Sequence, residues 1–306
     1  MKMDDIKYTF IIPHYNIPDL LVRCLKSIPD RDDIQILVCD DHSPNSENYI
    51  DEIPELGRKC VELCICPRNG GAGYARNEGL KKAVGKWLVF ADADDFFEDG
   101  VLQLLDKYYE SSHDVVYFNI RSVYSNDITK EANRGVGQVE LFKEYNESGD
   151  STPFRYNYTE PWGKMVNRSL VEENKIKFDE TKVCNDYYFS VQVGCLAKTI
   201  GVVDAPLYVL TLREGSLCYE FADTKEKLLT RVDVNSRVQM FLEKHGYGYL
   251  IPMVNRDLMV ILLKKYPFSF IRQLFVLYKQ GFDVKKLLKQ IFQKKYRQSL
   301  RKELHA

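Results

Sequence analysis

The sequence predicts an α/β protein in which a mostly parallel sheet is flanked by helices and followed by a C-terminal helical extension. Two observations carry this prediction. Over the first 120 residues, short apolar runs typical of buried strands alternate with segments of helical periodicity. From Thr224 onward only helical periodicity remains. We therefore expect one domain over residues 1–218 and a basic, amphipathic helical region over residues 219–306.

The composition is that of an ordinary globular protein. The chain has 306 residues, of which 45% are hydrophobic and 28% charged, enough for one large domain or two smaller ones. Its net charge is −1, so the overall charge gives no reason to expect a nucleic-acid partner. No apolar run approaches the roughly eighteen residues of a membrane span, and no signal peptide is visible. We expect a cytoplasmic protein whose eight cysteines are reduced.

The predicted strands of the first half each lead into a polar cluster. The strands are expected at residues 8–12, 34–39, 61–66, 86–91 and 114–119. The clusters are His14-Tyr15-Asn16, Asp40-Asp41, residues 68–73 and residues 92–95. In parallel sheets with right-handed crossovers, ligands bind beyond the carboxyl ends of the strands. The sequence therefore predicts a ligand site at this edge of the sheet.

Helices are expected between these strands and again later in the chain. In the first half they cover residues 18–28, 74–84 and 100–109, with a polar helix beginning near Ser46. Residues 121–160 are polar and predict a long surface excursion. A strand over 162–167, helices near 169–174 and 186–196, and a pair of strands across 200–212 are expected to follow.

An acidic cluster follows the fourth predicted strand. In an extended chain Asp92 and Asp94 point to the same side, and Asp95 lies next to them. Carboxylates held this close repel one another unless a cation offsets their charge. A hard divalent cation such as Mg²⁺ or Mn²⁺ does this and is commonly shared with substrate phosphates. The alternative is a solvated acidic turn in which Asp95 caps the next helix.

A glycine-rich loop, Gly70-Gly71-Ala72-Gly73, precedes the predicted helix over 74–84. Glycines let the backbone approach a ligand, and a helix N-terminus favours an anion. The loop has neither the Gly-Lys-Ser/Thr ending of a Walker loop nor the glycine spacing of a dinucleotide fold. An ordinary turn is therefore an open alternative. Arg76, one turn into the helix, is placed to reach a diphosphate.

Four motifs in a fixed order resemble a known family. They are Ile11-Ile12-Pro13-His14-Tyr15-Asn16, then Cys39-Asp40-Asp41-His42-Ser43, then Asn69-Gly70-Gly71 with Ala75-Arg76-Asn77-Glu78-Gly79, then Asp92-Ala93-Asp94-Asp95. Together they resemble the family-2 glycosyltransferases with the GT-A nucleotide-binding fold, closely over residues 7–120 and more loosely to about 216. The resemblance implies inverting transfer of a sugar from a nucleotide-diphosphate sugar, usually a UDP-sugar, in bacterial surface-polysaccharide or lipopolysaccharide synthesis. Residues 1–120 would bind the donor, and residues 121–218 would hold the acceptor and the catalytic base.

The resemblance also assigns residues to the donor. The donor-binding set is Pro13, Tyr15, Asp40, Asp41, Arg76, Asp92 and Arg213. Within it, Asp41 would hold the base, and Asp40 would support that loop. Asp94 would bind the divalent cation, Mn²⁺ or Mg²⁺, with Asp92 or Asp95 as a further ligand. Such a cation neutralises charge on the departing nucleoside diphosphate. For Arg213, an exposed turn is the alternative.

The resemblance places the catalytic base at Asp186, in Cys184-Asn185-Asp186. The family pattern usually has an acidic residue where this chain has Asn185. Trp162 would face the acceptor, where an aromatic ring can stack on a sugar. Each residue also has a structural alternative: Asp186 as a helix N-cap, and Trp162 as a core residue.

The C-terminal region is strongly basic. Residues 271–306 hold ten Lys and Arg against Asp283 and Glu303. An apolar stripe accompanies them: Leu287, Leu288, Ile291, Phe292, Leu300 and Leu304. Such a helix can lie on an anionic membrane surface or pack on its own domain. The first reading predicts contact of 271–306 with the cytoplasmic face of the inner membrane, where a lipid-linked glycan acceptor would lie.

Three other functions fit parts of the pattern. A nucleotidyltransferase that makes a nucleotide sugar would want a basic glycine-rich loop after the first strand, where this chain has His14-Tyr15-Asn16. A phosphoryl-transfer enzyme with an Asp nucleophile would want its Asp-x-Asp motif on the first strand rather than the fourth. A non-catalytic nucleotide-sugar-binding relative is the non-enzyme alternative, motivated by Asn185.

Overall fold

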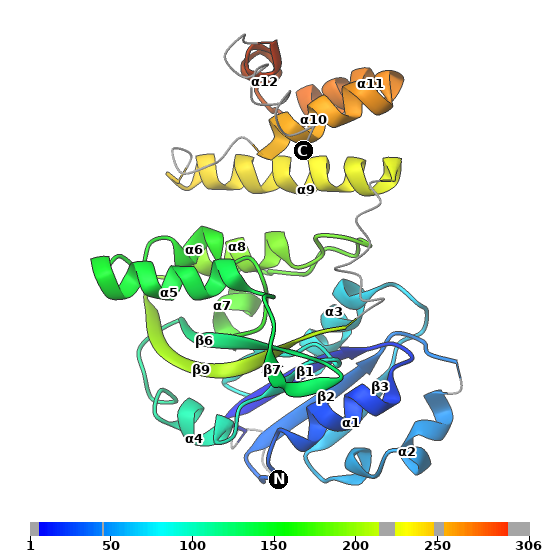
Figure 1. Ribbon diagram of the computed structural model, residues 1–306, viewed down its shortest axis with the longest axis vertical. Helices are drawn as coiled ribbons and strands as arrows, with labels where there is room; N and C mark the ends of the chain where they lie inside the picture. The colour runs from blue at the N-terminus through cyan, green and yellow to red at the C-terminus, as the bar shows by residue number, and fades with distance from the viewer. Residues whose placement is uncertain (1–5, 45, 214–223, 248–253, 293–306) are drawn as a thin grey trace. The chain divides into compact units, whose positions relative to one another are not determined.

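The computed structural model describes residues 6–44, 46–213, 224–247 and 254–292. The chain divides into two compact units, Met1–Glu220 and Phe221–Ala306, whose elements are labelled in Figure 1. The first unit contains the sheet and the second contains helices, so each is described by itself.

The first unit is organised around one sheet with the strand order β3-β2-β1-β4-β8-β6-β9-β5, in which β7 pairs with β6. The strands are β1 (Tyr8–His14), β2 (Ile34–Asp40), β3 (Val61–Ile65), β4 (Trp87–Phe90), β5 (Phe96–Phe97), β6 (Val115–Tyr124), β7 (Asp127–Glu131), β8 (Lys164–Asn167) and β9 (Ile200–Leu212). Strands β3, β2, β1 and β4 are parallel, whereas β8 is antiparallel to both β4 and β6. The predicted α/β class with a C-terminal helical extension is confirmed.

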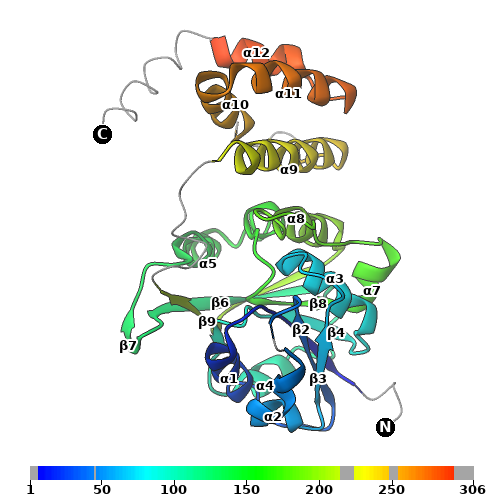
Figure 2. The ribbon, with the colours of Figure 1, turned by 90° about the vertical axis from the view of Figure 1, so that its right-hand side faces the viewer.

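Helices cover both faces of this sheet. They are α1 (Pro18–Lys26), α2 (Tyr49–Glu52), α3 (Ala72–Lys82), α4 (Val101–Asp106), α5 (Val136–Ser148), α6 (Phe154–Asn157), α7 (Arg168–Glu173) and α8 (Tyr187–Leu196). In Figure 2, α1 and α4 lie on one side of the sheet, and α3 and α8 lie on the other. All seven residues of β1 are buried, as expected for a strand covered on both faces. The core is therefore continuous across the sheet.

The expectation of a surface excursion over residues 121–160 is wrong. Strand β6 continues to Tyr124, and β7, α5 and α6 follow it. Phe142 and Phe154 are buried with ring centroids 4.9 Å apart, and Tyr158 stacks on Phe154. Helix α5 buries only Leu141 and Phe142, so it shows no apolar stripe by which a sequence pattern could find it.

Residues 200–212 form one strand rather than the predicted pair. Strand β9 runs parallel to β6, and its register shifts where Phe118 pairs with Val203 and Asn119 pairs with Pro206. The two residues between these partners bulge out of the ladder, which lets one strand pass the proline without losing the sheet.

The second unit consists, in its described residues, of α9 (Lys225–Lys244), α10 (Val254–Lys265), α11 (Pro267–Lys279) and α12 (Val284–Phe292). Its core includes Leu228, Val232, Met259, Leu262, Phe270, Leu277, Phe282, Leu287 and Ile291. Of the apolar stripe that the sequence predicts, Leu287 and Ile291 are buried in this core and Leu288 packs against it, whereas Phe292 is 52% exposed. Leu300 and Leu304 lie outside the described residues. No helix in the described part of the chain is long and apolar enough to cross a bilayer.

Candidate active site

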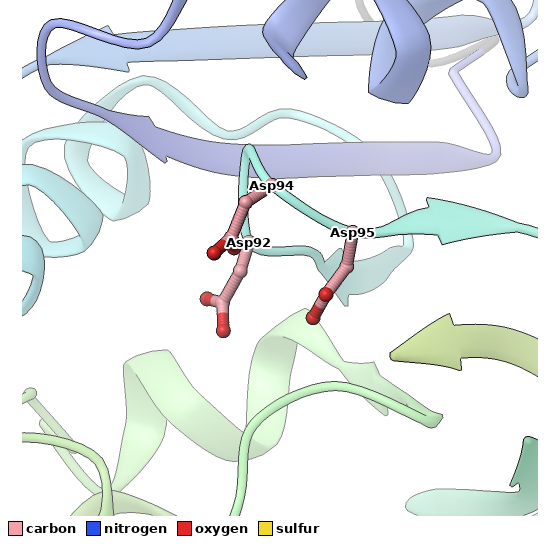
Figure 3. Close-up of side chains that lie close together, drawn as sticks. All are labelled: Asp92, Asp94 and Asp95. Carbon is pink, nitrogen blue, oxygen red and sulfur yellow. The ribbon is translucent and has the colours of Figure 1, made fainter. Parts of the chain in front are cut away.

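Three carboxylates meet in the turn between β4 and β5. Asp92, Asp94 and Asp95 each offer an oxygen atom within 4.8 Å of the others. Figure 3 shows that Asp92 and Asp94 lie side by side and that Asp95 extends from the same turn. Oxygen ligands at this spacing are the donor set that a hard divalent cation takes. The residues therefore fit a cation held by this turn.

The carboxylate of Asp95 is engaged in contacts within the protein. It is fully buried, accepts a hydrogen bond from the Thr211 backbone N–H at 2.7 Å, and lies 3.3 Å from the Tyr208 hydroxyl that donates to it. Arg134 contacts the same carboxylate at 3.2 Å. Burial raises the pKa of Asp95 to about 8, and Arg134 opposes that rise. The next helix, α4, begins after Gly100, so Asp95 does not cap it.

The Asp94 side chain is 19% exposed, and its carboxylate pairs with Arg213. Its backbone carbonyl accepts hydrogen bonds from Arg23 and from the Thr211 hydroxyl, which fixes the turn. The Arg213 Nε atom lies 3.5 Å from the Asp94 carboxylate. Burial raises the pKa of Asp94, and the charge of Asp92 raises it further. A divalent cation at this position would favour the ionised form instead.

Arg76 joins the acidic turn to the start of α8. Its Nη2 donates to Asp92 at 2.6 Å, and its Nη1 donates to the Asn185 side-chain oxygen at 2.9 Å. Arg76 is 3% exposed, and its guanidinium lies over the Phe178 ring. The side chain of Asn185, where the family pattern has an acidic residue, is therefore an acceptor for this arginine.

Asp186 occupies the N-cap position of α8. Its backbone carbonyl accepts from the Ser190 N–H at 2.9 Å, but its side chain makes no capping hydrogen bond. Asp186 is thus the N-cap residue of α8 by its backbone, but its carboxylate does not cap the helix. Burial raises the pKa of Asp186, Arg76 opposes the rise, and Asp92 adds to it. A carboxylate with a raised pKa is a stronger base than an ordinary aspartate.

Asp41 holds the glycine-rich loop. Its two carboxylate oxygens accept from the backbone N–H groups of Gly70 and Gly71 at 2.8 and 2.7 Å. Gly71 has φ +86°, a conformation that glycine adopts without strain, and a Cβ on Gly70 would lie 2.5 Å from the Tyr74 ring. The loop after β3 is therefore bound to the end of β2, and it requires glycine at both positions.

The carboxylate of Asp40 connects the end of β1 to the loop after β2 by hydrogen bonds. His14 Nδ1 donates to Asp40 at 2.7 Å, and His14 Nε2 accepts from the Ile17 N–H at 3.1 Å. The Ser43 hydroxyl and backbone N–H also donate to Asp40, each at 2.7 Å. These hydrogen bonds lower the pKa of Asp40 although burial alone would raise it.

Pro13 and Tyr15 lie at the same end of the sheet. Pro13 is buried within β1, and Tyr15 follows the strand with 49% of its surface exposed. Tyr15 is therefore available to a ligand, whereas Pro13 shapes the strand end from within.

Trp162 is a core residue in this structure. It is 4% exposed, and its ring stacks on Tyr208 with centroids 5.9 Å apart. Tyr158 packs against its edge. Trp162 therefore packs in the core, which is the alternative to a role in acceptor binding. Contact between Trp162 and an acceptor stays a prediction.

Lys164 is a buried lysine within electrostatic reach of Asp186. It is 1% exposed, and its Nζ donates to the Tyr158 carbonyl at 3.2 Å. The same atom lies over the rings of Tyr158 and Tyr117, at 4.9 and 5.2 Å from their centroids. Burial lowers the pKa of Lys164 to about 7, although the charges of Glu160 and Asp186 favour its protonated form.

The Lys164 pKa predicts a pH dependence of stability. Between about pH 7 and pH 10 the unfolded chain holds a proton on this amine that the folded chain lacks. The free energy of unfolding should therefore rise with pH in this window, by up to about 1.4 kcal/mol per unit from this group. Denaturant unfolding of the native protein and of Lys164→Met at several pH values measures the difference. Parallel curves for the two proteins would show that Lys164 is charged in the fold.

Several residues at the site carry no signal in the sequence. They are Arg23, Arg134, Tyr208 and Thr211. Arg134 lies in the region expected to be a surface excursion, and its Nη2 approaches Asp92 at 3.9 Å. Tyr208 and Thr211 reach the acidic turn because β9 pairs with β5, the strand that follows the turn, and with β6.

With this geometry established, comparison with known proteins places the chain in a family. The glycosyl transferase family 2 model matches residues 9–175, and the chain belongs to that family. Over 220 residues it is 28% identical to the poly(ribitol-phosphate) beta-glucosyltransferase of Bacillus spizizenii, covering 69% of this chain and 33% of the relative. The chain therefore spans about a third of that relative's length.

Solved structures share the fold. Staphylococcus aureus TarS 1–349 in complex with UDP-GlcNAc has a TM-score of 0.62 at 22% identity, covering 77% of this chain and 66% of that one. A mannosyltransferase from Pyrobaculum calidifontis in complex with GDP-Man and Mn²⁺ has a TM-score of 0.55 at 16% identity, covering 95% and 82%. At these identities the likeness concerns the fold alone, and the predicted GT-A class is confirmed.

Proposed function

We propose that the chain is an inverting, cation-dependent glycosyltransferase that moves a sugar from a nucleotide-diphosphate sugar to an acceptor hydroxyl. The observation that carries the proposal is the pair of hydrogen bonds made by Arg76, to Asp92 and to Asn185. They hold a carboxylate turn suited to a cation and a diphosphate next to Asp186. A glycosyltransferase needs a donor site and a base in this relation, because both act on one anomeric carbon.

The donor in this proposal is a UDP-sugar. Tyr15 is exposed beside the Asp41 loop, so a nucleoside would lie between them, with Pro13 and Asp40 shaping that end. Arg76 and Arg213 would neutralise the diphosphate through charge-assisted hydrogen bonds. Support comes from the fold shared with a protein solved in complex with UDP-GlcNAc.

Asp94 would hold the divalent cation, Mn²⁺ or Mg²⁺, with Asp92 as the second ligand. We prefer Asp92 to Asp95 as this ligand because the Asp95 oxygens already receive Thr211 and Tyr208. When bound, the cation would stabilise charge on the leaving diphosphate. A structural neighbour solved with Mn²⁺ supports a cation of this class.

Asp186 would act as the general base. It would take the proton from the acceptor hydroxyl while that oxygen attacks the anomeric carbon from the face opposite the diphosphate. The new glycosidic bond would form as the bond to the diphosphate breaks, which inverts the configuration. Burial of Asp186, which raises its pKa, suits this role.

The acceptor would be a glycan or a lipid-linked glycan in bacterial surface-polysaccharide or lipopolysaccharide synthesis. Sequence similarity to an enzyme named for poly(ribitol-phosphate) supports a polymer of the cell surface. We propose that the protein acts at the cytoplasmic face of the inner membrane, where a lipid-linked acceptor would lie. Trp162 would border the acceptor once part of its ring is uncovered.

A non-catalytic nucleotide-sugar-binding relative is the second candidate, because Asn185 stands where the family usually has an acidic residue. In this structure the side-chain oxygen of Asn185 accepts a hydrogen bond from Arg76, so Asn185 still helps to hold Arg76 in place. A nucleotidyltransferase is the weaker alternative, since no basic glycine-rich loop follows β1.

A thermal-shift panel of nucleoside diphosphates and nucleotide sugars, each with Mn²⁺, Mg²⁺ or chelator, tests the donor site. Ligand at one hundred times its dissociation constant should add about 2.7 kcal/mol of stability. We expect uridine diphosphate or its sugars to stabilise the protein, and chelator or Asp94→Ala to remove the effect. Asp32→Ala, at an exposed aspartate, serves as the matched control. A panel without any response would exclude the donor site and with it the transferase.

A further inference from the structure

Helix α11 has an exposed apolar face. Phe268, Ile271, Phe275 and Tyr278 are 86%, 65%, 58% and 70% exposed. Their spacing of three, four and three residues puts them on one side of a helix with 3.6 residues per turn. Single exposed apolar side chains scattered over a surface are normal. Four large ones together on one helix face instead mark an interaction site.

The opposite face of α11 already serves the fold. Phe270, Gln273 and Leu277 are buried, and Phe270 and Leu277 belong to the core of the second unit. The exposed face is therefore not needed to hold α11 in its unit. It also differs from the α12 stripe, because Leu287 and Ile291 are buried in that same core.

Cations surround the exposed face. Residues 264–292 hold seven Lys and Arg, all exposed, and one acidic residue. Arg272 and Lys279 lie on α11 itself, and the Lys279 Nζ is 4.6 Å from the centroid of the Phe275 ring. The acidic residue, Asp283, accepts a hydrogen bond from the Lys286 backbone N–H at the start of α12. No carboxylate therefore accompanies the apolar side chains on α11.

We propose that this face of α11 is a docking surface for an anionic lipid bilayer. Protruding aromatic and aliphatic side chains flanked by Lys and Arg are what an interfacial helix uses, with the apolar side chains among the acyl chains and the cations at the phosphates. A bilayer matches both features at once, since its surface is negative and its interior apolar. The inference rests on α11 and its neighbours alone, not on the proposed transfer reaction.

Vesicle co-sedimentation of the full chain tests this proposal. Vesicles of phosphatidylcholine with phosphatidylglycerol should bind the protein at least about tenfold more tightly than vesicles of phosphatidylcholine alone. The double variant Phe268→Ser with Phe275→Ser should weaken binding about tenfold or more. Arg272→Gln should weaken it about fivefold, as expected for one cation at an anionic surface.

The matched control is Tyr124→Ser with Ile128→Ser, which removes two exposed apolar side chains from the first unit and should leave vesicle binding unchanged. The midpoint of unfolding should stay the same in both double variants, because the replaced side chains are already exposed. Response to nucleotides in the thermal-shift panel should also persist, so the two proposals fail separately. Equal binding to neutral and to anionic vesicles would overturn the proposal, and so would unchanged vesicle binding of Phe268→Ser with Phe275→Ser. It would also be overturned if the native chain formed a dimer that this variant could not form while both still bound vesicles.

Discussion

Asp186→Asn is expected to abolish sugar transfer while leaving the donor bound. The amide keeps the size of the side chain but cannot accept the proton of the acceptor hydroxyl, and general-base catalysis is worth about 10²–10⁴ in rate. Transfer to acceptor is measured as product formed at saturating donor, and donor affinity is measured by calorimetry. Asp32→Asn, at an exposed aspartate, controls for the loss of a charge.

The pH profile of the native enzyme adds a second readout. Burial raises the pKa of Asp186, so this carboxylate becomes protonated at a higher pH than an ordinary aspartate. As the solution is acidified, the rate of transfer should therefore begin to fall at a higher pH than an ordinary aspartate would give. Survival of transfer in Asp186→Asn would remove this residue as the base. Loss of donor binding in the same variant would instead show that Asp186 shapes the donor site.

Arg76→Met is expected to cost about 3 kcal/mol or more in the free energy of unfolding, and to reduce both donor affinity and transfer. The variant removes a buried guanidinium and leaves the half-buried side chains of Asp92 and Asn185 without their shared donor, and breaking such an ion pair on one side is strongly destabilising. Urea unfolding measures the first effect, and the thermal-shift panel measures the second.

Arg68→Met is the matched control for Arg76. Arg68 pairs with Glu180 at 2.9 Å, but both side chains are largely exposed, so the loss should stay below about 1 kcal/mol. Equal losses in the two variants would mean that the Arg76 contacts contribute no more than a surface ion pair.

The donor side of the site was predictable because it depends on local pattern and on one rule of topology. Each of β1, β2 and β4 is a buried apolar run, and the polar residues after it fall at the same edge of a parallel sheet. For this reason the sequence predicts Asp41, Asp92 and Asp94 at that edge, and in the structure they follow β2 and β4 there, while their roles toward a donor stay predictions. Family resemblance then supplied Asp186, which lies far along the chain.

The rest of the site depends on contacts that no local pattern contains. Arg134 reaches Asp95 across 39 residues of sequence, and Tyr208 reaches it across 113. Tyr208 lies opposite Phe97 where β9 pairs with β5, and Arg134 also donates to the Thr211 carbonyl of β9. The position of β9 depends in turn on its register against β6, which a bulge changes partway along the strand. The helix α5 was missed for a different reason, since it buries too few side chains to produce a helical period.

In the proposed reaction, Arg76 would also link the binding of the two substrates thermodynamically. Arg76 contacts Asp92 and Asn185, the neighbour of the proposed base Asp186, so a diphosphate that reorients Arg76 would change the surroundings of the acceptor as well. By reciprocity, whatever factor the donor applies to acceptor affinity, the acceptor applies to donor affinity. Without the Arg76 side chain that factor should approach one, and each substrate should then bind as if the other were absent.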